Sequence, residues 1–295
     1  MSRPFKIAVA SGKGGTGKTT VATSLALSQA GRQHCLVDCD VEAPNAHLFF
    51  ELTEFDHAPV TKRIPVVDFN SCTYCGKCAE VCQFNAISVL NNPILAKQNV
   101  LIFPNLCHSC GACTYTCPEK AMSEKPIAIG EIHVFDTLED LTIFSGEMQV
   151  GTAMAVPIIQ EVQMKAEEFA SEADIIVYDS PPGNSCSVVE TIKKVDFVLL
   201  VTEPTPFGLH DLKLTVDLVQ QLGKPTGVVI NRDGIGNDDV ENFLKLKRIP
   251  ILMRIPYNPD IATQLAQGIP LIKQSDEWKQ TIENLILAIT QEETA

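Results

Sequence analysis

The fold is decided by residues 12–19, which read Gly12-Lys13-Gly14-Gly15-Thr16-Gly17-Lys18-Thr19. This stretch fits the pattern G-x-x-x-x-G-K-[ST], and it lies between an apolar run at residues 5–10 and a helical pattern over about residues 18–30. Glycines allow successive backbone N–H groups to converge on a phosphate, and the start of a helix adds positive potential. A strand, a glycine-rich loop and a helix in this order predict a site for a nucleoside triphosphate.

The loop supplies most of the predicted nucleotide contacts. In such a loop a lysine reaches the β- and γ-phosphates and the following hydroxyl binds Mg²⁺, and these roles fall to Lys18 and Thr19. We therefore predict ATP or ADP together with Mg²⁺ as cofactors. The predicted nucleotide-binding residues of this segment are Gly12, Gly14, Gly15, Thr16, Gly17, Lys18, Thr19 and Thr20.

Short apolar runs separated by helical stretches continue along the chain. Strands that are short, apolar throughout and spaced by amphipathic helices indicate a parallel sheet with both faces covered. The predicted fold is therefore α/β, a P-loop NTPase with a mostly parallel sheet covered by helices on both faces. The further predicted strands are residues 34–38, 174–179, 196–202, 226–231 and 249–255, and the clearest helical stretches are residues 156–170, 209–222 and 238–247.

Eight of the eleven cysteines fall in two runs, residues 72–87 and 107–122, which align without gaps. Each run has the spacing C-x₂-C-x₂-C-x₃-C of bacterial ferredoxins, in which the fourth cysteine binds the other cluster. Cys₄ sites also hold zinc, usually on two separated C-x₂-C pairs, and a three-iron cluster at one site is a further alternative. We predict two [4Fe-4S] clusters. Cluster I takes Cys72, Cys75, Cys78 and Cys117, and cluster II takes Cys107, Cys110, Cys113 and Cys82.

The cysteine runs lie in a segment that interrupts the α/β pattern. Between about residues 59 and 126 the helical periodicity disappears, and Cys, Pro, Asn and Gly accumulate. We predict that residues 59–125 form a small inserted α+β ferredoxin-like module, and that residues 1–58 and 126–295 form the P-loop domain. Residues 127–144 alternate weakly, which favours a β-hairpin.

Lys13 is a second lysine that an ordinary phosphate loop does not require. With it, residues 13–19 resemble the deviant Walker A loop of the MinD/ParA family of ATPases. The resemblance implies ATP hydrolysis and ATP-dependent association, as a homodimer or with a related ATPase, in which Lys13 crosses to the partner's nucleotide. It makes Lys13 and Lys18 catalytic candidates, and the alternative for Lys13 is a solvated side chain.

Other segments resemble the family in the expected order. Residues 38–45 look like switch I, where Asp40 positions or activates the attacking water and Asp38 helps the metal shell, although acidic pairs at strand ends often only cap loops. Asp179 fits the Walker B acid that holds Mg²⁺, and residues 180–183 look like switch II. The segments that resemble the family's adenine side contribute Asn231, Arg232, Pro256 and Tyr257.

The chain is acidic, with a formal net charge of −13 and a pI near 4.9. Such a chain repels phosphate backbones, so we expect no nucleic-acid partner. Residues 275–295 are acidic rather than a basic amphipathic helix, which argues against stable membrane association. No apolar run approaches the ~18–20 residues of a spanning helix, and the first residues lead into a strand rather than a signal peptide, so we expect a cytoplasmic protein.

Three cysteines lie outside the two runs. We interpret Cys35, Cys39 and Cys186 as buried or half-buried thiols. Cys186 follows Asp179 by seven residues, a spacing similar to that of a cluster ligand in the nitrogenase iron protein, so a subunit-bridging cluster is the alternative. The C-terminal C-x-x-C of Mrp-type cluster carriers is absent.

Together these features predict an ATPase that couples nucleotide state to electron transfer, through two clusters, to a redox partner. Two clusters in one pseudo-symmetric module are typical of electron relay, and clusters that only staple a short segment are the alternative. A second hypothesis is an ATPase that assembles or delivers an iron-sulfur cluster or another metallocentre to an apo-metalloprotein. A third is a MinD-like positioning switch with structural clusters.

Overall fold

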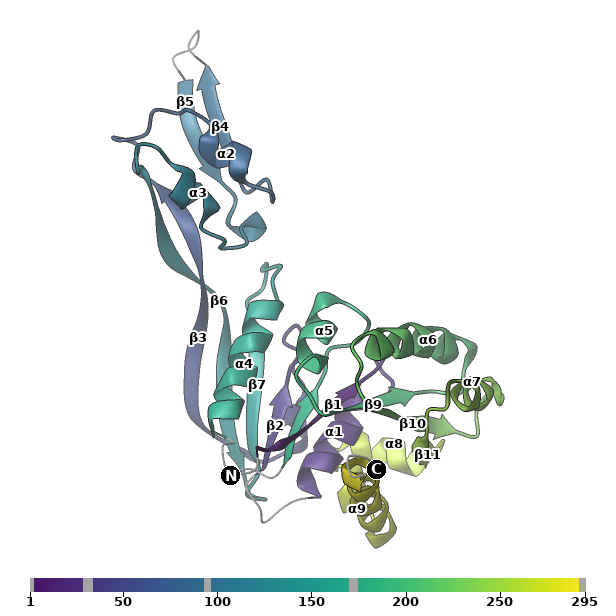
Figure 1. The fold of residues 1–295 in the computed structure, drawn as a ribbon. Coiled ribbons are helices and arrows are strands. Elements are labelled where there is room, and N and C mark those ends of the chain that lie inside the picture. Colours follow the sequence, from purple (N-terminus) through teal and green to yellow (C-terminus); the bar gives the residue numbers. More distant parts are fainter. Residues whose placement is uncertain (1–2, 29–33, 93–96, 170–174, 292–295) are drawn as a thin grey trace. The chain divides into compact units, whose positions relative to one another are not determined.

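The structure is a computed structural model that describes residues 3–28, 34–92, 97–169 and 175–291 (Figure 1). The chain divides into two compact units. The first comprises Met1–Ala58, Ile132–Glu147 and Ile158–Ala295, and the second comprises Pro59–Glu131 and Met148–Pro157. The second unit begins at the first residue of the predicted module. It extends past residue 125 to Glu131 and also takes in Met148–Pro157, a segment that we had assigned to the P-loop domain.

A nine-stranded sheet runs in the order β11-β10-β9-β1-β8-β2-β7-β6-β3. Neighbouring strands from β11 to β7 are all parallel, which confirms the predicted mostly parallel α/β sheet. Residues 127–144 fall mainly in β6 and β7, and β7 also pairs with β2. The strands are β1 Phe5–Ala10, β2 His34–Asp38, β3 Leu52–Val67, β6 Met122–Thr137, β7 Thr142–Met148, β8 Ile175–Asp179, β9 Phe197–Thr202, β10 Thr226–Asp233 and β11 Ile251–Pro256.

Helices follow most of the parallel strands, as expected for crossover connections in a parallel sheet. They are α1 Lys18–Leu27, α4 Val156–Phe169, α5 Cys186–Ile192, α6 Pro206–Gln221, α7 Asp239–Lys247, α8 Pro259–Ala266 and α9 Asp276–Gln291, with the 3₁₀ turns η1 Ala46–Phe49 and η4 Leu271–Lys273. In the parts of the chain that the structure covers, no helix combines the length and apolarity needed to span a bilayer.

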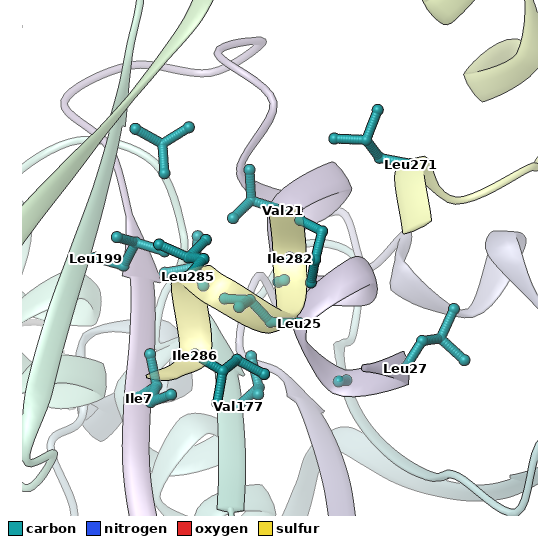
Figure 2. Close-up of a cluster of buried hydrophobic side chains, with 14 of the residues drawn as sticks. Ile7, Val21, Leu25, Leu27, Val177, Leu199, Leu271, Ile282, Leu285 and Ile286 are labelled. Carbon is teal, nitrogen blue, oxygen red and sulfur yellow. The ribbon is translucent and has the colours of Figure 1, made fainter. Parts of the chain in front are cut away.

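Both faces of the central strands are covered. Ile7 of β1 and Val177 of β8 are buried in an apolar cluster with residues of α1 and α9 (Figure 2). Their neighbours Ala8 and Tyr178 are equally buried, and the Tyr178 hydroxyl donates to Glu167 of α4 at 3.3 Å. Successive strand residues point to opposite faces, so helices shield both sides of the sheet. Each fully buried Val, Leu or Ile stabilises the fold by about 1.5–3 kcal/mol.

The described residues of the second unit form small apolar clusters. A two-stranded antiparallel sheet joins β4 Ile87–Asn92 to β5 Lys97–Ile102, and the helical turns are α2 Lys77–Val81, α3 Ala112–Thr116 and η2 Pro104–Leu106. Among its described residues, one small buried cluster consists of Ile64, Ala86 and Cys107, and another of Ile87, Val100 and Met122. Cysteine side chains pack against both clusters, so the same side chains that we predict as cluster ligands border the core.

Several predicted boundaries fall outside the described residues. These are the helix ends at residues 30 and 170, the strand start at residue 174, and residues 292–295 of the acidic C-terminal segment.

Candidate nucleotide site and cysteine pockets

The loop between β1 and α1 has a backbone that only glycine adopts easily. Gly17 caps α1 with a φ of 96°, in the left-handed region that disfavours other residues. A Cβ atom at Gly17 would lie 2.5 Å from Nδ2 of Asn231, which itself donates to the Thr16 carbonyl at 2.8 Å. A Cβ atom at Gly12 would lie 2.4 Å from the Asp211 carbonyl oxygen. The structure therefore brings Asn231 directly onto the loop. Gly12 is required by packing against the Asp211 backbone, and Gly17 is required by its positive φ.

Lys18 and three carboxylates converge just after the loop. Lys18 is buried, which lowers its pKa, and the charges of Asp179, Asp40 and Asp38 oppose that shift. Burial raises the pKa of Asp179 and of Asp38, and their mutual repulsion adds to the effect on Asp179. Burial, followed by the charge of Asp38, raises the pKa of Asp40 to about 6. When ionised, these three carboxylates carry more negative charge than Lys18 balances, as expected where a cation binds.

Thr19 and Asp179 have the arrangement expected of a Mg²⁺ site. The Thr19 hydroxyl donates to Oδ2 of Asp179 at 2.6 Å. The other carboxylate oxygen of Asp179, Oδ1, is buried and has no hydrogen-bond partner among the described residues. A buried oxygen without a partner is costly unless a ligand satisfies it, and hard oxygen donors suit Mg²⁺. The residues present therefore fit the predicted metal.

Asp38 organises the loop that follows β2. One carboxylate oxygen accepts from the backbone N–H of Asp40 at 3.0 Å, and the other accepts from those of Asn45 and Ala46, each at 2.9 Å. Asp38 thus fixes the segment that carries Asp40. Its predicted part in the metal shell stays a prediction.

Lys13 is held by a carboxylate that the sequence did not single out. Glu203 directly follows β9 and is buried, and its Oε2 lies 2.9 Å from Nζ of Lys13. Its Oε1 lies 2.8 Å from Nη1 of Arg232. Two predicted site residues from distant segments therefore share one acid. The sequence feature that could have predicted Glu203 as a site residue is its position, as an acid, at the end of an apolar strand. The same feature identified Asp179.

The last predicted nucleotide residues lie at the ends of β10 and β11. Pro256 pairs with Asp233, and the Tyr257 N–H donates to the Asp233 carbonyl at 2.8 Å. Tyr257 is exposed. The segment is thus tied to the residue that follows Arg232, and its contact with an adenine ring stays a prediction.

The eight clustered cysteines line two separate pockets, four in each. The first pocket contains about 360 Å³ of empty space and the second about 380 Å³, in each case including space open to solvent. The first is lined by Cys72, Cys75, Cys78 and Cys117, and the second by Cys82, Cys107, Cys110 and Cys113. This division matches the two predicted ligand sets, including the exchange of the fourth cysteine between the runs.

Backbone N–H groups surround both pockets in the same way. In the first pocket Tyr74 and Ala121 donate to the sulfurs of Cys72 and Cys117, at 3.4 and 3.3 Å. In the second pocket the corresponding donors are Ser109 to Cys107 at 3.4 Å and Ala86 to Cys82 at 3.3 Å. Hydrogen bonds to thiolate sulfurs are one of the means by which proteins hold and tune iron-sulfur clusters. Four thiols around each cavity, with such donors, fit one [4Fe-4S] cluster per pocket.

The described residues contain no group of three or more His, Cys, Asp or Glu side chains placed to hold one metal ion. In a [4Fe-4S] cluster each of the four cysteines binds a different iron.

The other cysteines behave differently from one another. Cys35 and Cys39 are buried, as predicted, and burial raises the pKa of each thiol. Cys186, the first residue of α5, is exposed, so its interpretation as a buried or half-buried thiol was wrong. Cys186 is exposed because α5 begins at the surface and only its later residues are buried.

A glycine loop between a buried strand and a helix, with a hydroxyl-carboxylate pair beside it, defines a P-loop nucleotide-binding protein. The family profile CobQ/CobB/MinD/ParA nucleotide binding domain matches residues 7–271, and the chain belongs to this family. It is an ATPase of the MinD/ParA type.

Known proteins resemble the chain over most of its length. The protein MJ0578 of Methanocaldococcus jannaschii is 31% identical over 282 residues, which is 95% of each chain. The cytosolic Fe-S cluster assembly factor Nubp2 homolog of Anopheles gambiae is 23% identical and covers 91% of this chain and 88% of its own. The septum site-determining protein MinD of Pyrococcus horikoshii, solved with Mg-ADP, has the same fold, with a TM-score of 0.55, 21% identity, and coverage of 97% of this chain and 96% of its own.

Proposed function

We propose that this chain is a cytoplasmic ATPase whose second unit holds two [4Fe-4S] clusters and passes electrons through them to a partner protein as ATP binds and is hydrolysed. The observation that carries the proposal is the division of eight cysteines into two four-cysteine pockets. When bound, such clusters supply one-electron redox chemistry.

The crossed arrangement of the cysteines supports a relay. Cys82 belongs to the first run but lines the second pocket, and Cys117 belongs to the second run but lines the first. Cys78 of one pocket and Cys113 of the other pack against the same small apolar cluster. The two pockets therefore share backbone and core, so the loss of one cluster disturbs the site of the other. Electron transfer leaves all these bonds in place.

The nucleotide site contains the residues that ATP hydrolysis requires. Lys18 offsets the charge of the phosphates, and Thr19 with Asp179 holds Mg²⁺. Asp40, with a pKa of about 6, is ionised at neutral pH and is suited to orient a water molecule. Lys13 reaches a partner's nucleotide after it leaves Glu203, so the chain associates with a second copy or a related ATPase when ATP is bound.

Delivery of a cluster to an apo-metalloprotein is the second candidate. It is favoured by the relative from Anopheles gambiae, whose name is that of an Fe-S cluster assembly factor. In this function the clusters, or one of them, are cargo. Release from either pocket then requires exchange of thiolates from both cysteine runs.

One anaerobic experiment separates the two functions. Protein with reconstituted clusters is reduced with dithionite and mixed with extract of its native cells plus Mg-ATP or Mg-ADP, and reoxidation and protein-bound iron are followed together. Electron transfer predicts faster reoxidation with Mg-ATP and full retention of iron. The matched control is Lys18→Ala, which lacks the phosphate contact and leaves the cysteines intact.

Two results would contradict the relay. Reoxidation at the same rate with either nucleotide removes the coupling to ATP. Appearance of iron and sulfide in an added apo-protein, with loss from this chain, establishes delivery instead.

A further inference from the structure

Lys62 is a buried cation beside the second cysteine pocket. It lies on β3 within the second unit and is 6% exposed. Its Nζ donates to the carbonyl oxygens of Pro104 and Cys107, at 2.8 and 3.1 Å, and to Sδ of Met154 at 3.4 Å. These three acceptors match the three N–H bonds of an ammonium group, whereas a neutral amine has only two. Burial lowers the pKa of Lys62, and the charge of Cys107 opposes that shift.

The remaining features of the two pockets are closely matched. Each has two N–H donors to sulfur, at 3.3 to 3.4 Å. Each is also lined by one lysine or arginine and one acid, which are Lys77 and Glu119 in the first pocket and Arg63 and Glu124 in the second. The second pocket is also lined by His108, whose ring stacks on Phe84. Arg63 and Glu124 form an ion pair of 3.2 Å.

Lys62 breaks this symmetry. In the alignment of the two runs Cys72 corresponds to Cys107, and no lysine or arginine of the described residues donates to the Cys72 carbonyl. The second pocket therefore has one extra positive charge, and this charge is shielded from water. A buried charge is screened less than an exposed one, so it acts more strongly on its surroundings.

We propose that Lys62 gives the cluster held by Cys82, Cys107, Cys110 and Cys113 the higher reduction potential of the two. The inference rests on the proposed binding of two clusters. Reduction adds one electron and one negative charge without making or breaking a bond, and a nearby cation stabilises that charge. Lys62 thus determines where a single electron in the pair resides, and it gives the relay a direction, from the first pocket to the second.

The test is a redox titration of anaerobically reconstituted protein, followed by electron paramagnetic resonance. Wild type is expected to show two reduction steps. Lys62→Met keeps the aliphatic stem and removes the charge. The reduction potential of the higher step should therefore fall by about 59 mV, which corresponds to a change on the order of tenfold in the equilibrium constant of a one-electron reduction, while the potential of the lower step stays the same. Lys62→Arg keeps the higher step in place. Lys77→Met, the control at an exposed lysine of the first pocket, shifts neither step appreciably.

Iron and sulfide analysis distinguishes a failure of cluster binding from a failure of the role of Lys62. Wild-type protein that takes up no iron or sulfide contradicts the proposed function itself. The role of Lys62 is contradicted if wild type binds both clusters but shows a single reduction step, or if Lys62→Met leaves both reduction potentials unchanged. Neither result contradicts the binding of two clusters. If Lys62→Met loses iron, Lys62→Gln, which keeps a donor for the Cys107 carbonyl without the charge, carries the same expectation.

Discussion

Asp179→Asn is expected to make the empty protein more stable and at the same time inactive. Asp179 is buried beside Asp38 and Asp40, and in the absence of a metal ion its charge is stabilised by the hydrogen bond from Thr19 and by the charge of Lys18. The substitution keeps the size of the side chain, and an amide oxygen still accepts the hydrogen bond that Thr19 donates at 2.6 Å. It therefore removes the charge with little change in packing.

The magnitude follows from the raised pKa of Asp179. One unit of pKa shift corresponds to about 1.4 kcal/mol of interaction between the two protonation states. Burial and the charge of Asp38 both raise this pKa, so ionised Asp179 costs the folded state free energy at neutral pH. Allowing for coupling among the carboxylates, we expect Asp179→Asn to raise the free energy of unfolding by on the order of 1–3 kcal/mol. For a domain of about 150–250 residues each 1 kcal/mol raises Tm by about 2–4 °C.

The assay is thermal unfolding at pH 7.5 in EDTA, and again with Mg-ADP or Mg-ATP, together with ATP hydrolysis. Wild type should gain stability on binding Mg-nucleotide, whereas Asp179→Asn should begin higher and gain less. The matched control is Asp217→Asn, an exposed carboxylate 3.2 Å from Lys247, whose loss should change stability by less than about 1 kcal/mol. A lower Tm for Asp179→Asn in EDTA, or an undiminished gain with Mg-nucleotide, would refute the reasoning.

Three further predictions concern the same site. The raised pKa of Asp40, about 6, means that its contribution to stability is present at low pH and is lost as the pH rises through that value. In urea unfolding in EDTA, the free energy of unfolding of wild type should therefore fall by on the order of 1 kcal/mol relative to that of Asp40→Asn between pH 5 and 7.5. Parallel pH profiles of the two proteins would contradict this. Glu203→Gln should lower the free energy of unfolding by about 1–2 kcal/mol. A double-mutant cycle with Lys13→Met should give a coupling energy above about 0.5 kcal/mol. Strict additivity of the two substitutions would show that the 2.9 Å ion pair contributes nothing to stability. Gly17→Ala should abolish nucleotide binding in calorimetry, because the new methyl group meets Asn231 and φ is 96°, and unchanged affinity would show that the loop tolerates a different backbone.

The features that the sequence predicts best are those whose determinants are local. The glycine pattern of residues 12–19 specifies a turn, and positive φ values at Gly15 and Gly17 are the physical reason for those glycines. The cysteine spacing is equally local, and Tyr74 and Ser109, at matching positions of the two runs, both have φ near 55°. The shape of each ligand loop is thus repeated with its sequence.

Contacts between distant segments were not predictable in this way. Lys13 and Glu203 are 190 residues apart, and neither residue carries a local signal of the other. Lys62 looks like a solvated lysine in its strand, because its burial depends on carbonyl groups of Pro104 and Cys107 some forty residues later. The inclusion of Met148–Pro157 in the second unit likewise depends on contacts such as the 2.9 Å bond from the Gln149 N–H to the Ile129 carbonyl.

If the second unit holds the proposed iron-sulfur clusters, its small apolar core has a consequence for cells short of iron. Clusters of three buried residues contribute too little to fold a segment without help, whereas the sheet and its helices have a large core that needs no metal. Under the proposed function, a newly made chain in such a cell would therefore still bind nucleotide before its second unit gained its clusters. Iron supply, rather than protein synthesis, would then set how many copies reach working order.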